Sequence, residues 1–445
     1  MVDLRRIGVN ERAPGSGPEW TLTAGGDCCI IDRSRNTEGP EDAVRQAITE
    51  ELHELVAGAD VAIANMEGPI RTCSAAISKS GPAIQMDTAG PFVLKRMGFD
   101  VISLANNHIM DYGVQGLVST IEACRREGLL ISGAGNDERE AMKPAEVVIA
   151  GRIRVSILAF CEREFGVAEG SQPGSAWISH PRAFERVAKA AETADVVVVL
   201  AHGGVEEVPF SPVQRQEQLR QFIDAGATLV IGHHPHVPQG WERYQKGMIF
   251  YSLGNFLFDY PDDACCPLAE WGLVIQAHFC GAVLSEIELV PVEMLDDRRV
   301  GRLRESRNPE QYLCYLHRLS ALLAEPGVVI PYWQETAVHL WTTRYQPWLL
   351  RACGAKTSTS TDSVRFHLSG LYRAVRCRIG WLYKRNQSAS VPEIKNGLLL
   401  LNMARNESHR WTIETALAVL HGDAFDRRTP EIRSEVSELL TWVEG

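Results

Sequence analysis

No stretch of this sequence reaches the roughly 18 uninterrupted apolar residues that a membrane-spanning helix requires. The N-terminal segment, MVDLRRIGVNERAPGSGPEW, also lacks the apolar run of about 7 to 15 residues that a secretory signal contains. The 11 cysteines include no CxxC pair and no regular framework, which argues against a zinc ribbon and against a secreted disulfide scaffold. These absences lead us to expect a cytoplasmic protein whose thiols stay reduced.

The chain also lacks a surplus of basic residues. Its formal net charge is -11, and binding to a phosphate backbone needs an excess of lysine and arginine, so we expect no nucleic-acid partner. The composition, 45% hydrophobic and 23% charged, is that of an ordinary globular protein. Because single cores stop growing near roughly 250 to 300 residues, a chain of 445 residues should contain two domains.

From residue 21 to about 294, short β-rich runs alternate with polar, helix-like stretches, which is typical of layered α/β architecture. The later sequence is arginine-rich and helix-like. We expect an N-terminal extension (1–20), a main α/β domain (21–298) and a helical C-terminal domain (299–445). The expected strands are 21–27, 60–68, 99–108, 153–160, 195–204, 227–236, 248–258, 272–279 and 284–292. The expected helices are 41–58, 114–127, 181–194, 212–225, 309–324, 333–353, 364–386 and 411–422.

Several of the expected strands end in clusters of polar residues. Open α/β sheets place their ligand sites beyond the carboxyl ends of strands, so we expect these clusters to converge on one crevice. Five of the 13 histidines lie at just three strand ends. Carboxylates, amides and imidazoles can together hold a divalent metal. The candidate residues are Asp27, Glu67, Asn107, His108, His202, His233, His234 and His236.

Most of these residues, taken singly, also have a structural explanation. Asp27 after two glycines is typical of a turn, Glu67 is compatible with a helix cap or a surface carboxylate, and His202 with a structural histidine. The segment GHHPH (232–236) is harder to explain by packing, because neutral imidazole is polar and costs free energy when it is buried without partners.

The segment NNHIMDYG (106–113) supports a further role in acid catalysis. The side-chain carbonyl of Asn107 can ligate a metal, and His108 can act as a general acid. The carboxylate of Asp111, three residues on, can orient that imidazole. The alternative is an asparagine-rich turn that caps the next helix.

Six motifs follow one another along the chain: GGD (25–27), NMEGP (65–69), SLANNHIMDYG (103–113), LAHGGVEE (200–207), IDAGATLVIGHHPHVPQG (223–240) and IFYSLGNFLFD (249–259). In this order they resemble the CapA family, which is associated with poly-gamma-glutamate capsule synthesis. The resemblance covers roughly residues 20–295 and is more specific than any single motif.

The resemblance implies an α/β fold: the four-layer αββα sandwich of the calcineurin-like metallophosphoesterases, followed here by a mostly helical region. It implies one or two divalent metal ions (Mn, Fe, Zn or Co) held by loops at the sheet edge. By the same analogy His108 and Asp111 form a catalytic acid pair, while Asn65, His234 and Asn255 line the pocket. The implied metal ligands are Asp27, Glu67, Asn107, His202, His233 and His236.

Two positions depart from the family pattern. Metallophosphoesterases commonly begin with Asp-x-His, but Asp27 is followed by Cys28 and Cys29, so that one ligand is missing or is replaced by a thiolate. The aromatic residue that usually follows the fourth-motif histidine is Gly203 here, from which we expect a wider pocket or an altered choice of substrate.

The resemblance thus implies a metal-dependent hydrolase that acts on a phosphoester, or a related intermediate, in the biosynthesis of a capsule or a poly-gamma-glutamate-like polymer. Metal-activated water would attack and His108 would protonate the leaving group. The central bond of such a polymer is an amide, so the bond cleaved stays open, and the substrate is expected to be a small molecule or an anionic polymer. The alternative is a non-catalytic assembly or polymer-handling protein, which has no need of His108 beside Asp111.

Residues 364–386 interleave basic with apolar side chains, as does a helix that lies on an anionic membrane or binds an anionic polymer. Peripheral membrane contact is therefore one interpretation, and a bundle helix with a solvated charged face is the other. The tryptophans at 333, 341 and 348 are expected to lie in a core. The sequence carries no signal for the oligomeric state.

Overall fold

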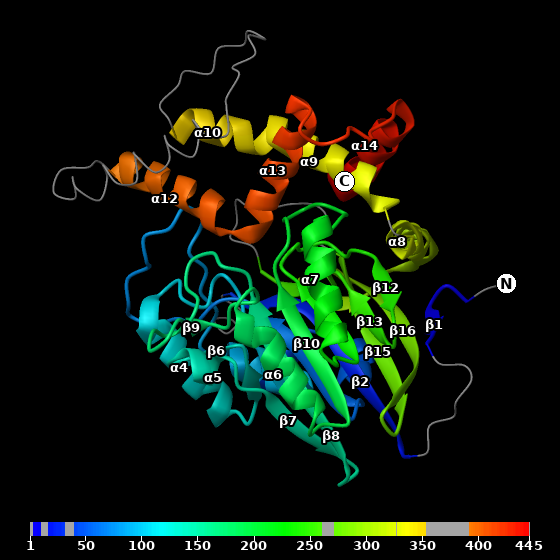
Figure 1. Ribbon diagram of the computed structural model, residues 1–445. Helices are drawn as coiled ribbons and strands as arrows, with labels where there is room; N and C mark the ends of the chain where they lie inside the picture. Colours follow the sequence, from blue (N-terminus) through cyan, green and yellow to red (C-terminus); the bar gives the residue numbers. More distant parts are fainter. Residues whose placement is uncertain are drawn as a thin grey trace.

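The computed structural model describes residues 3–9, 17–31, 40–259, 271–325, 327–352 and 391–444. Two β-sheets lie face to face in it, helices cover their outer faces, and a further group of helices lies across one end of the sandwich (Figure 1).

The larger sheet has nine strands in the order β1-β16-β15-β2-β3-β4-β5, with β14 paired to β2 and β17 paired to β16. The strands β14, β2, β3, β4 and β5 run parallel to one another, whereas β15 and β16 are antiparallel to their neighbours. The bounds are β1 (Arg6–Gly8), β2 (Glu19–Cys29), β3 (Val61–Met66), β4 (Val101–Ser103), β5 (Leu130–Ser132), β14 (Asn255–Phe258), β15 (Trp271–Cys280), β16 (Val283–Met294) and β17 (Val300–Arg302).

The second sheet has six strands in the order β12-β13-β11-β10-β8-β7. Its central strands β8, β10, β11 and β13 are parallel, and each edge strand is antiparallel to its neighbour. The bounds are β7 (Ala145–Ile149), β8 (Ile153–Cys161), β10 (Val196–His202), β11 (Leu229–His233), β12 (Trp241–Tyr244) and β13 (Gly247–Phe250); β6 (Ala134–Gly135) and β9 (Gly174–Ser175) form a separate small pair.

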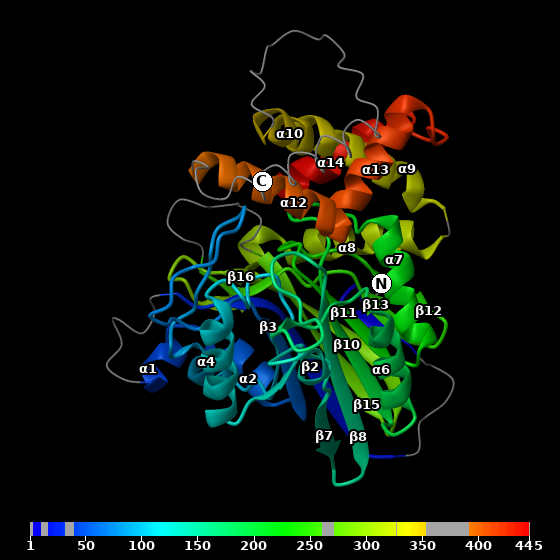
Figure 2. The same cartoon turned by 60° about the vertical axis from the view of Figure 1, so that its left-hand side comes forward.

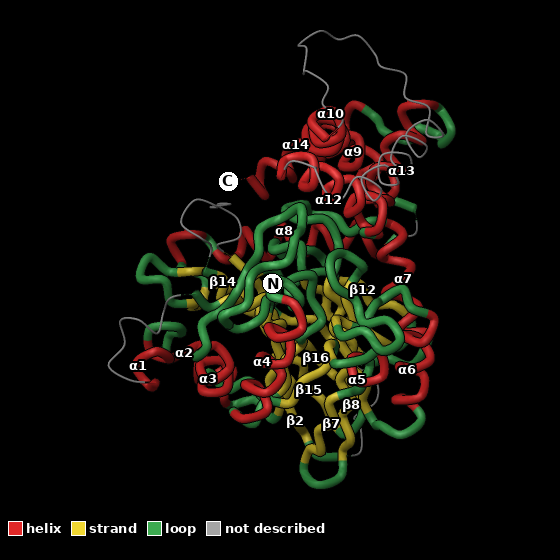
Figure 3. Tube along the Cα trace, turned by 90° about the vertical axis from the view of Figure 1, so that its left-hand side faces the viewer, coloured by secondary structure: helices red, strands yellow, loops and turns green. Residues whose placement is uncertain are grey.

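The side chains of β3 show how the layers form, because successive residues of a strand point to opposite faces of its sheet. Val61 and Ile63 belong to the core between the two sheets, while Ala62 and Ala64 belong to the core under the outer helices. Helices lie on both sides of the paired sheets (Figure 3), so the layers run helix, sheet, sheet, helix and confirm the predicted αββα sandwich. The helices of the sandwich are α1 (Pro40–Arg45), α2 (Glu50–Ala57), α3 (Gly90–Arg96), α4 (Gly113–Arg126), α5 (Glu138–Ala141), α6 (Pro181–Ala191) and α7 (Val213–Asp224).

The described chain after residue 303 is helical and lies across the end of the sandwich (Figure 2). Its apolar side chains, among them Leu316, Trp333 and Leu417, are buried in the same core as the six-stranded sheet. Whether this region is a separate domain that begins at residue 299 stays a prediction. Its elements are α8 (Pro309–Ala324), α9 (Val329–Leu340), a π-helical turn (Trp341–Tyr345), α10 (Gln346–Ala352), α12 (Val391–Arg405), α13 (Glu407–His421) and α14 (Pro430–Glu444).

Within the described residues, no single helix is long and apolar enough to span a membrane. The segments 309–324 and 329–352, which meet at an angle of 112°, pass the same test of length and composition only when they are taken together. Their large apolar side chains, such as Leu316 and Trp333, lie in the protein core.

The structure corrects three of the expected elements. The expected helix 41–58 is two helices, because Ile48 between them forms a β-bridge with Val300. The expected strand 248–258 is divided: the chain turns through Gly254, at φ 67°, and passes from the six-stranded sheet to the nine-stranded one. The helix expected at 333–353 begins at Val329 and contains the π-helical turn just before Pro347, a residue without the N–H that a regular helix needs.

The predicted basic helix 364–386 lies outside the described residues, and α12 and α14 were not predicted at all. The tryptophans behave as expected, because Trp333 and Trp341 are buried and Trp348 packs against the same core.

A buried carboxylate, Glu162, holds the helical region against the end of strand β8. Its Oε1 accepts a hydrogen bond from Asn406 Nδ2 at 2.8 Å, and its Oε2 accepts one from Ser408 Oγ at 2.7 Å and pairs with the guanidinium of Arg215. Burial opposes ionisation of Glu162, but Arg215, His234 and the hydrogen bonds from Ser408 and Asn406 together outweigh it and lower the pKa of this carboxyl. The group is therefore charged at neutral pH and joins three parts of the chain.

Replacing Glu162 by glutamine should destabilise the protein by about 3–5 kcal/mol, because the substitution leaves the buried Arg215 without its counter-charge. The free energy of unfolding in urea measures this. Glu169→Gln is the matched control, since Glu169 pairs with Arg163 on the surface and should change stability by less than ~1 kcal/mol. Equal stabilities of the two variants would contradict the role given to Glu162.

Candidate metal centre

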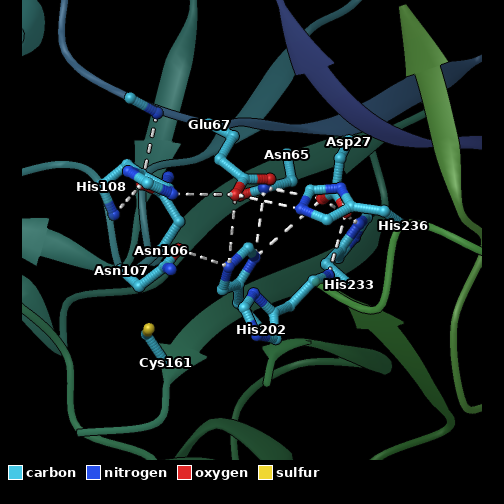
Figure 4. Close-up of polar contacts among 12 residues, drawn as sticks. Asp27, Asn65, Glu67, Asn106, Asn107, His108, Cys161, His202, His233 and His236 are labelled. Atoms are coloured by element: carbon cyan, nitrogen blue, oxygen red, sulfur yellow. Dashed lines mark hydrogen bonds and ion pairs between the residues drawn. The ribbon is translucent and has the colours of Figure 1, made fainter. Parts of the chain in front are cut away.

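The carboxyl ends of five strands meet at the end of the sandwich beneath the helical region. Asp27 lies in β2, Glu67 follows β3, and Asn107 and His108 follow β4. From the facing sheet, His202 ends β10 and the GHHPH segment ends β11. Figure 4 shows these side chains pointing toward one another, as expected for the ends of parallel strands.

Glu67 lies at the centre of this group and is fully buried. Three imidazole Nε2 atoms surround its Oε1: that of His236 at 3.7 Å, that of His108 at 3.8 Å and that of His202 at 3.9 Å. These separations are too long for hydrogen bonds. Those of His202 and His236 suit side chains that share a cation with Glu67, because two ligands at ~2.1 Å from one ion lie roughly 3.5 Å apart.

Asp27 connects the two sheets at the site. Its Oδ1 accepts a hydrogen bond from Asn65 Nδ2 at 2.8 Å and lies 3.2 Å from His233 Nδ1. Its Oδ2 accepts the backbone N–H of His234 at 2.9 Å. The same Asn65 amide lies 3.3 Å from His202 Nδ1, so one asparagine orients both a carboxylate and an imidazole.

The GHHPH turn has an unusual backbone conformation, which directs its imidazoles toward the site. His234 and His236 both have positive φ, at 95° and 60°, a region that residues other than glycine rarely adopt. Backbone strain of this kind persists where the surroundings impose it, and it is frequent at functional sites. Asn255, from the segment that crosses between the sheets, lies with its Oδ1 2.9 Å from His236 Nδ1 and orients that ring.

The residues present fit a divalent metal in two groups. Asp27, Glu67 and His202 form one group, and Glu67, His234 and His236 form the other; within each group the ligand atoms lie within 4.8 Å of one another. Glu67 is common to both groups. The second group includes His234, which the family resemblance had placed in the pocket and not among the ligands.

Unsatisfied polar atoms support this fit. Both carboxylate oxygens of Glu67, Nε2 of His233 and Nδ1 of His234 are buried and have no hydrogen-bond partner in the described part of the protein. Burial, and then the charge of Asp27, raises the pKa of Glu67 well above its ordinary value. A cation beside Glu67 would supply the positive counter-charge that stabilises the ionised carboxylate.

His202 is kept in the form that binds a metal. Burial, and then the charge of His234, lowers the pKa of the His202 imidazole well below its ordinary value, so the ring is neutral at pH 7. Its Nε2 lies 3.1 Å from Oδ1 of Asn107, the residue expected to supply an amide ligand. The preceding Asn106 instead fixes the loop, because its Nδ2 donates to the backbone carbonyl of Met66 at 2.8 Å.

His108 and Asp111 are hydrogen-bonded to each other, with 2.7 Å between Nδ1 and Oδ2. The side chain of Asp111 is fully buried, and that of His108 is 7% exposed. Burial and then the charge of Lys79 lower the pKa of His108, although Asp111 opposes them. The Nδ1 side of the ring faces Asp111 and the Nε2 side faces Glu67, so a proton held at Nε2 would lie at the candidate metal centre.

The two departures from the family pattern have structural explanations. Cys28 and Cys29 are fully buried, which raises the pKa of both thiols and opposes thiolate formation, and neither belongs to a metal group among the described residues. The expectation of a wider pocket at Gly203 was wrong. A Cβ at this position would lie 2.6 Å from Arg215 Nη2 and 2.9 Å from Glu162 Oε2, so the buried ion pair occupies the space.

Sequence reasoning missed several residues near the site. Glu162 follows a buried strand as Glu67 does, and the same strand-end rule would have found it. Lys79 lies in the polar loop before α3, where no periodicity or motif distinguishes it. The helical region adds Asn402, whose Nδ2 donates to Glu164 at 2.9 Å, and Arg344, which contacts Glu207 at 3.2 Å.

The fold and the site define an αββα protein with a candidate metal centre at the carboxyl ends of its parallel strands. The family described as bacterial capsule synthesis protein PGA_cap matches residues 21–260, which is more than half of the chain. The chain therefore belongs to this family.

Three relatives illustrate the similarity. The chain is 40% identical over 173 residues to the capsule biosynthesis protein CapA of Bacillus anthracis (37% of this chain, 42% of that protein) and 40% identical over 170 residues to the PGA biosynthesis protein CapA of Bacillus subtilis (38% and 44%). It is 29% identical over 214 residues to a probable polyglutamine synthesis accessory protein of Mycobacterium tuberculosis (45% and 56%). The matched part thus spans about half, or less, of these relatives.

Two solved structures are more distantly similar. They are the 5'-nucleotidase from Candida albicans, with a TM-score of 0.37 and 12% identity over 64% of this chain and 54% of that one, and TT1561 of Thermus thermophilus, with a TM-score of 0.32 and 12% identity over 58% and 94%. Scores this low carry no conclusion about function.

Because Glu67 belongs to both metal groups, Glu67→Gln should reduce the bound metal to background. Elemental analysis of the purified protein measures this. The variants His202→Ala and His234→Ala then separate the groups, since each should release only an ion that its own group holds.

His53→Ala is the matched control for these variants, because His53 lies on α2 outside both groups. It should retain the wild-type metal content. Wild-type metal content in Glu67→Gln would contradict the assignment of the centre.

Proposed function

We propose that this protein is a metal-dependent hydrolase. The observation that carries the proposal is Glu67, a buried carboxylate that receives no hydrogen bond from the described part of the chain. It lies within 4 Å of three imidazoles and beside the hydrogen-bonded pair of His108 and Asp111. Buried polar groups without partners are rare, and they often mark places where an ion or a substrate belongs. The pair of His108 and Asp111 supplies a proton donor, which a site that only binds a ligand would not need.

A bound divalent metal would supply Lewis-acid activation of a water and of the scissile group. Asp27, Glu67 and the imidazoles of the two groups would hold it. His108 would donate the Nε2 proton to the leaving oxygen or nitrogen. The ring that remains is neutral and keeps its other proton on Nδ1, bonded to Asp111.

We further propose that the substrate is a phosphoester, or a related intermediate, in the biosynthesis of a capsule or a polyglutamate-like polymer. The names of the relatives support the role in polymer biosynthesis, since two are capsule or PGA biosynthesis proteins and one is a probable polyglutamine synthesis accessory protein. The metal chemistry serves a phosphoryl or an amide centre equally well, so the substrate class rests on family context and not on the site.

A second candidate is a non-catalytic assembly or polymer-handling protein on the same fold. The name of the mycobacterial relative, an accessory protein, favours it. In this case the metal centre would bind the polymer or stabilise the protein, and it would catalyse no reaction. The two candidates differ in what His108 does, because only hydrolysis uses its proton.

On an aryl phosphate whose leaving group needs a proton, His108→Gln should lower kcat by about 10²–10⁴-fold, the usual contribution of a general acid. Metal content should stay close to that of the wild type, which separates loss of the acid from loss of the centre. The control is His421→Gln, at an exposed position at the end of α13.

Two results would contradict this proposal in different ways. Full activity in the His108→Gln variant would show that His108 is not the general acid. A wild-type protein that binds metal but hydrolyses neither aryl phosphates nor glutamyl amides would favour the non-catalytic candidate.

A further inference from the structure

The loop between β3 and α3 places a lysine against the acid pair. The side chain of Lys79 is 2% exposed, and its Nζ lies 2.6 Å from Asp111 Oδ1 and 3.1 Å from His108 Nδ1. The ring of Phe165 covers the ammonium group, with its centroid 4.2 Å away. Burying a lysine to this degree is costly unless the ammonium group is paired.

We propose that Lys79 is a positioning residue, which holds the carboxyl group of Asp111 in place so that His108 presents Nε2 to the reacting group. This inference rests on the proposed hydrolase function. The motifs that carry the family resemblance do not include this lysine.

The hydrogen bonds of Asp111 show why a cation is needed. Its Oδ2 accepts from His108 Nδ1 at 2.7 Å and from the backbone N–H of Ile84 at 2.8 Å, and its Oδ1 accepts from Lys79. The carboxylate is fully buried, and a buried charge without a counter-charge is strongly destabilised. Without Lys79, the side chain of Asp111 would lose the contact that holds its Oδ1, and His108 would lose a fixed acceptor.

The short contact between Nδ1 and Oδ2 also fixes which nitrogen reacts. At 2.7 Å a proton must lie between the two atoms, because two facing lone pairs would repel each other. We place that proton on Nδ1, with the carboxyl oxygen of Asp111 as its acceptor. When the ring carries a second proton, that proton is on Nε2, the nitrogen that faces Glu67, and it is the one that His108 can release.

The loop that carries Lys79 is held at the same place. The backbone N–H of Ile77 donates to the carbonyl of Asp111 at 2.8 Å, and Ile84 N–H donates to its carboxylate. Lys79 is thus anchored on both sides in the chain. It contacts Asp111 and His108 rather than the centre of the site, so it acts through them.

The test uses aryl phosphates whose leaving phenols differ in basicity. A basic phenolate needs the proton from His108, whereas an acidic nitrophenolate leaves without it. Lys79→Met, which keeps the length of the side chain, should therefore lower kcat about 10²-fold on phenyl phosphate and much less on a nitrophenyl phosphate. Lys79→Arg, which keeps the charge, should recover part of the loss.

Two comparisons isolate the mechanism. Adding Lys79→Met to His108→Gln should cause little further loss, because residues that act as one unit are not additive. Lys95→Met is the matched control, since Lys95 also pairs with an aspartate, Asp100 at 2.9 Å, but on the surface. It should leave kcat unchanged on every substrate.

A second readout needs no turnover. In protein labelled with ¹⁵N-histidine, the His108 ring is identified by the signal that His108→Gln lacks. At a pH where the ring is neutral, it should carry its proton on Nδ1 in the wild type and populate both tautomers in Lys79→Met.

The outcomes separate the two proposals. A wild-type protein without hydrolytic activity would overturn the proposed function, and the tautomer would still test Lys79. An unchanged His108 tautomer in Lys79→Met, or an equal loss of kcat on all leaving groups, would overturn the positioning role.

Discussion

The structure depends on one electrostatic constraint: a buried carboxylate at the candidate metal centre that receives no hydrogen bond from the described residues. Glu67 follows β3 in the middle of the nine-stranded sheet, and it is fully buried without a hydrogen bond to either oxygen. Its neighbours are arranged to surround a cation and not to bond Glu67 directly. Without a cation, burial and the charge of Asp27 disfavour the ionised form of this group. The strand ends, the strained GHHPH turn and the bonded acid pair all lie around this carboxylate.

The helical region is tied to the same end of the sandwich by polar contacts. Glu162 accepts hydrogen bonds from Asn406 and Ser408, and Glu164 accepts one from Asn402. Glu162 also lies 3.9 Å from His234, with its Oε1 toward the Nε2 of a histidine in the second metal group. A carboxylate behind a candidate ligand can orient the ring and raise its basicity. The helices therefore do more than cover apolar surface. They hold Glu162 and Glu164 in position near the candidate metal centre.

Much of the sandwich could be predicted because the hydrophobic runs of parallel strands, and the polar residues at their ends, are local patterns. All nine expected strands overlap observed ones, and the candidate ligands meet because strand ends share an edge. What failed depends on distant partners. Ile48 interrupts a helix because of its bridge to Val300, and Gly203 faces an ion pair that comes from residues 162 and 215. Lys79 has no local signal, since only the fold brings it to Asp111.

The most direct test of the central claim is an anomalous-difference map from crystals of this protein soaked in Mn²⁺. We expect a peak coordinated by the carboxylate of Glu67, together with His202 or His236. If two ions bind, we expect two peaks that share Glu67. A map without a peak at Glu67, or with manganese bound only elsewhere, would contradict the assignment of this carboxylate as the centre of a metal site.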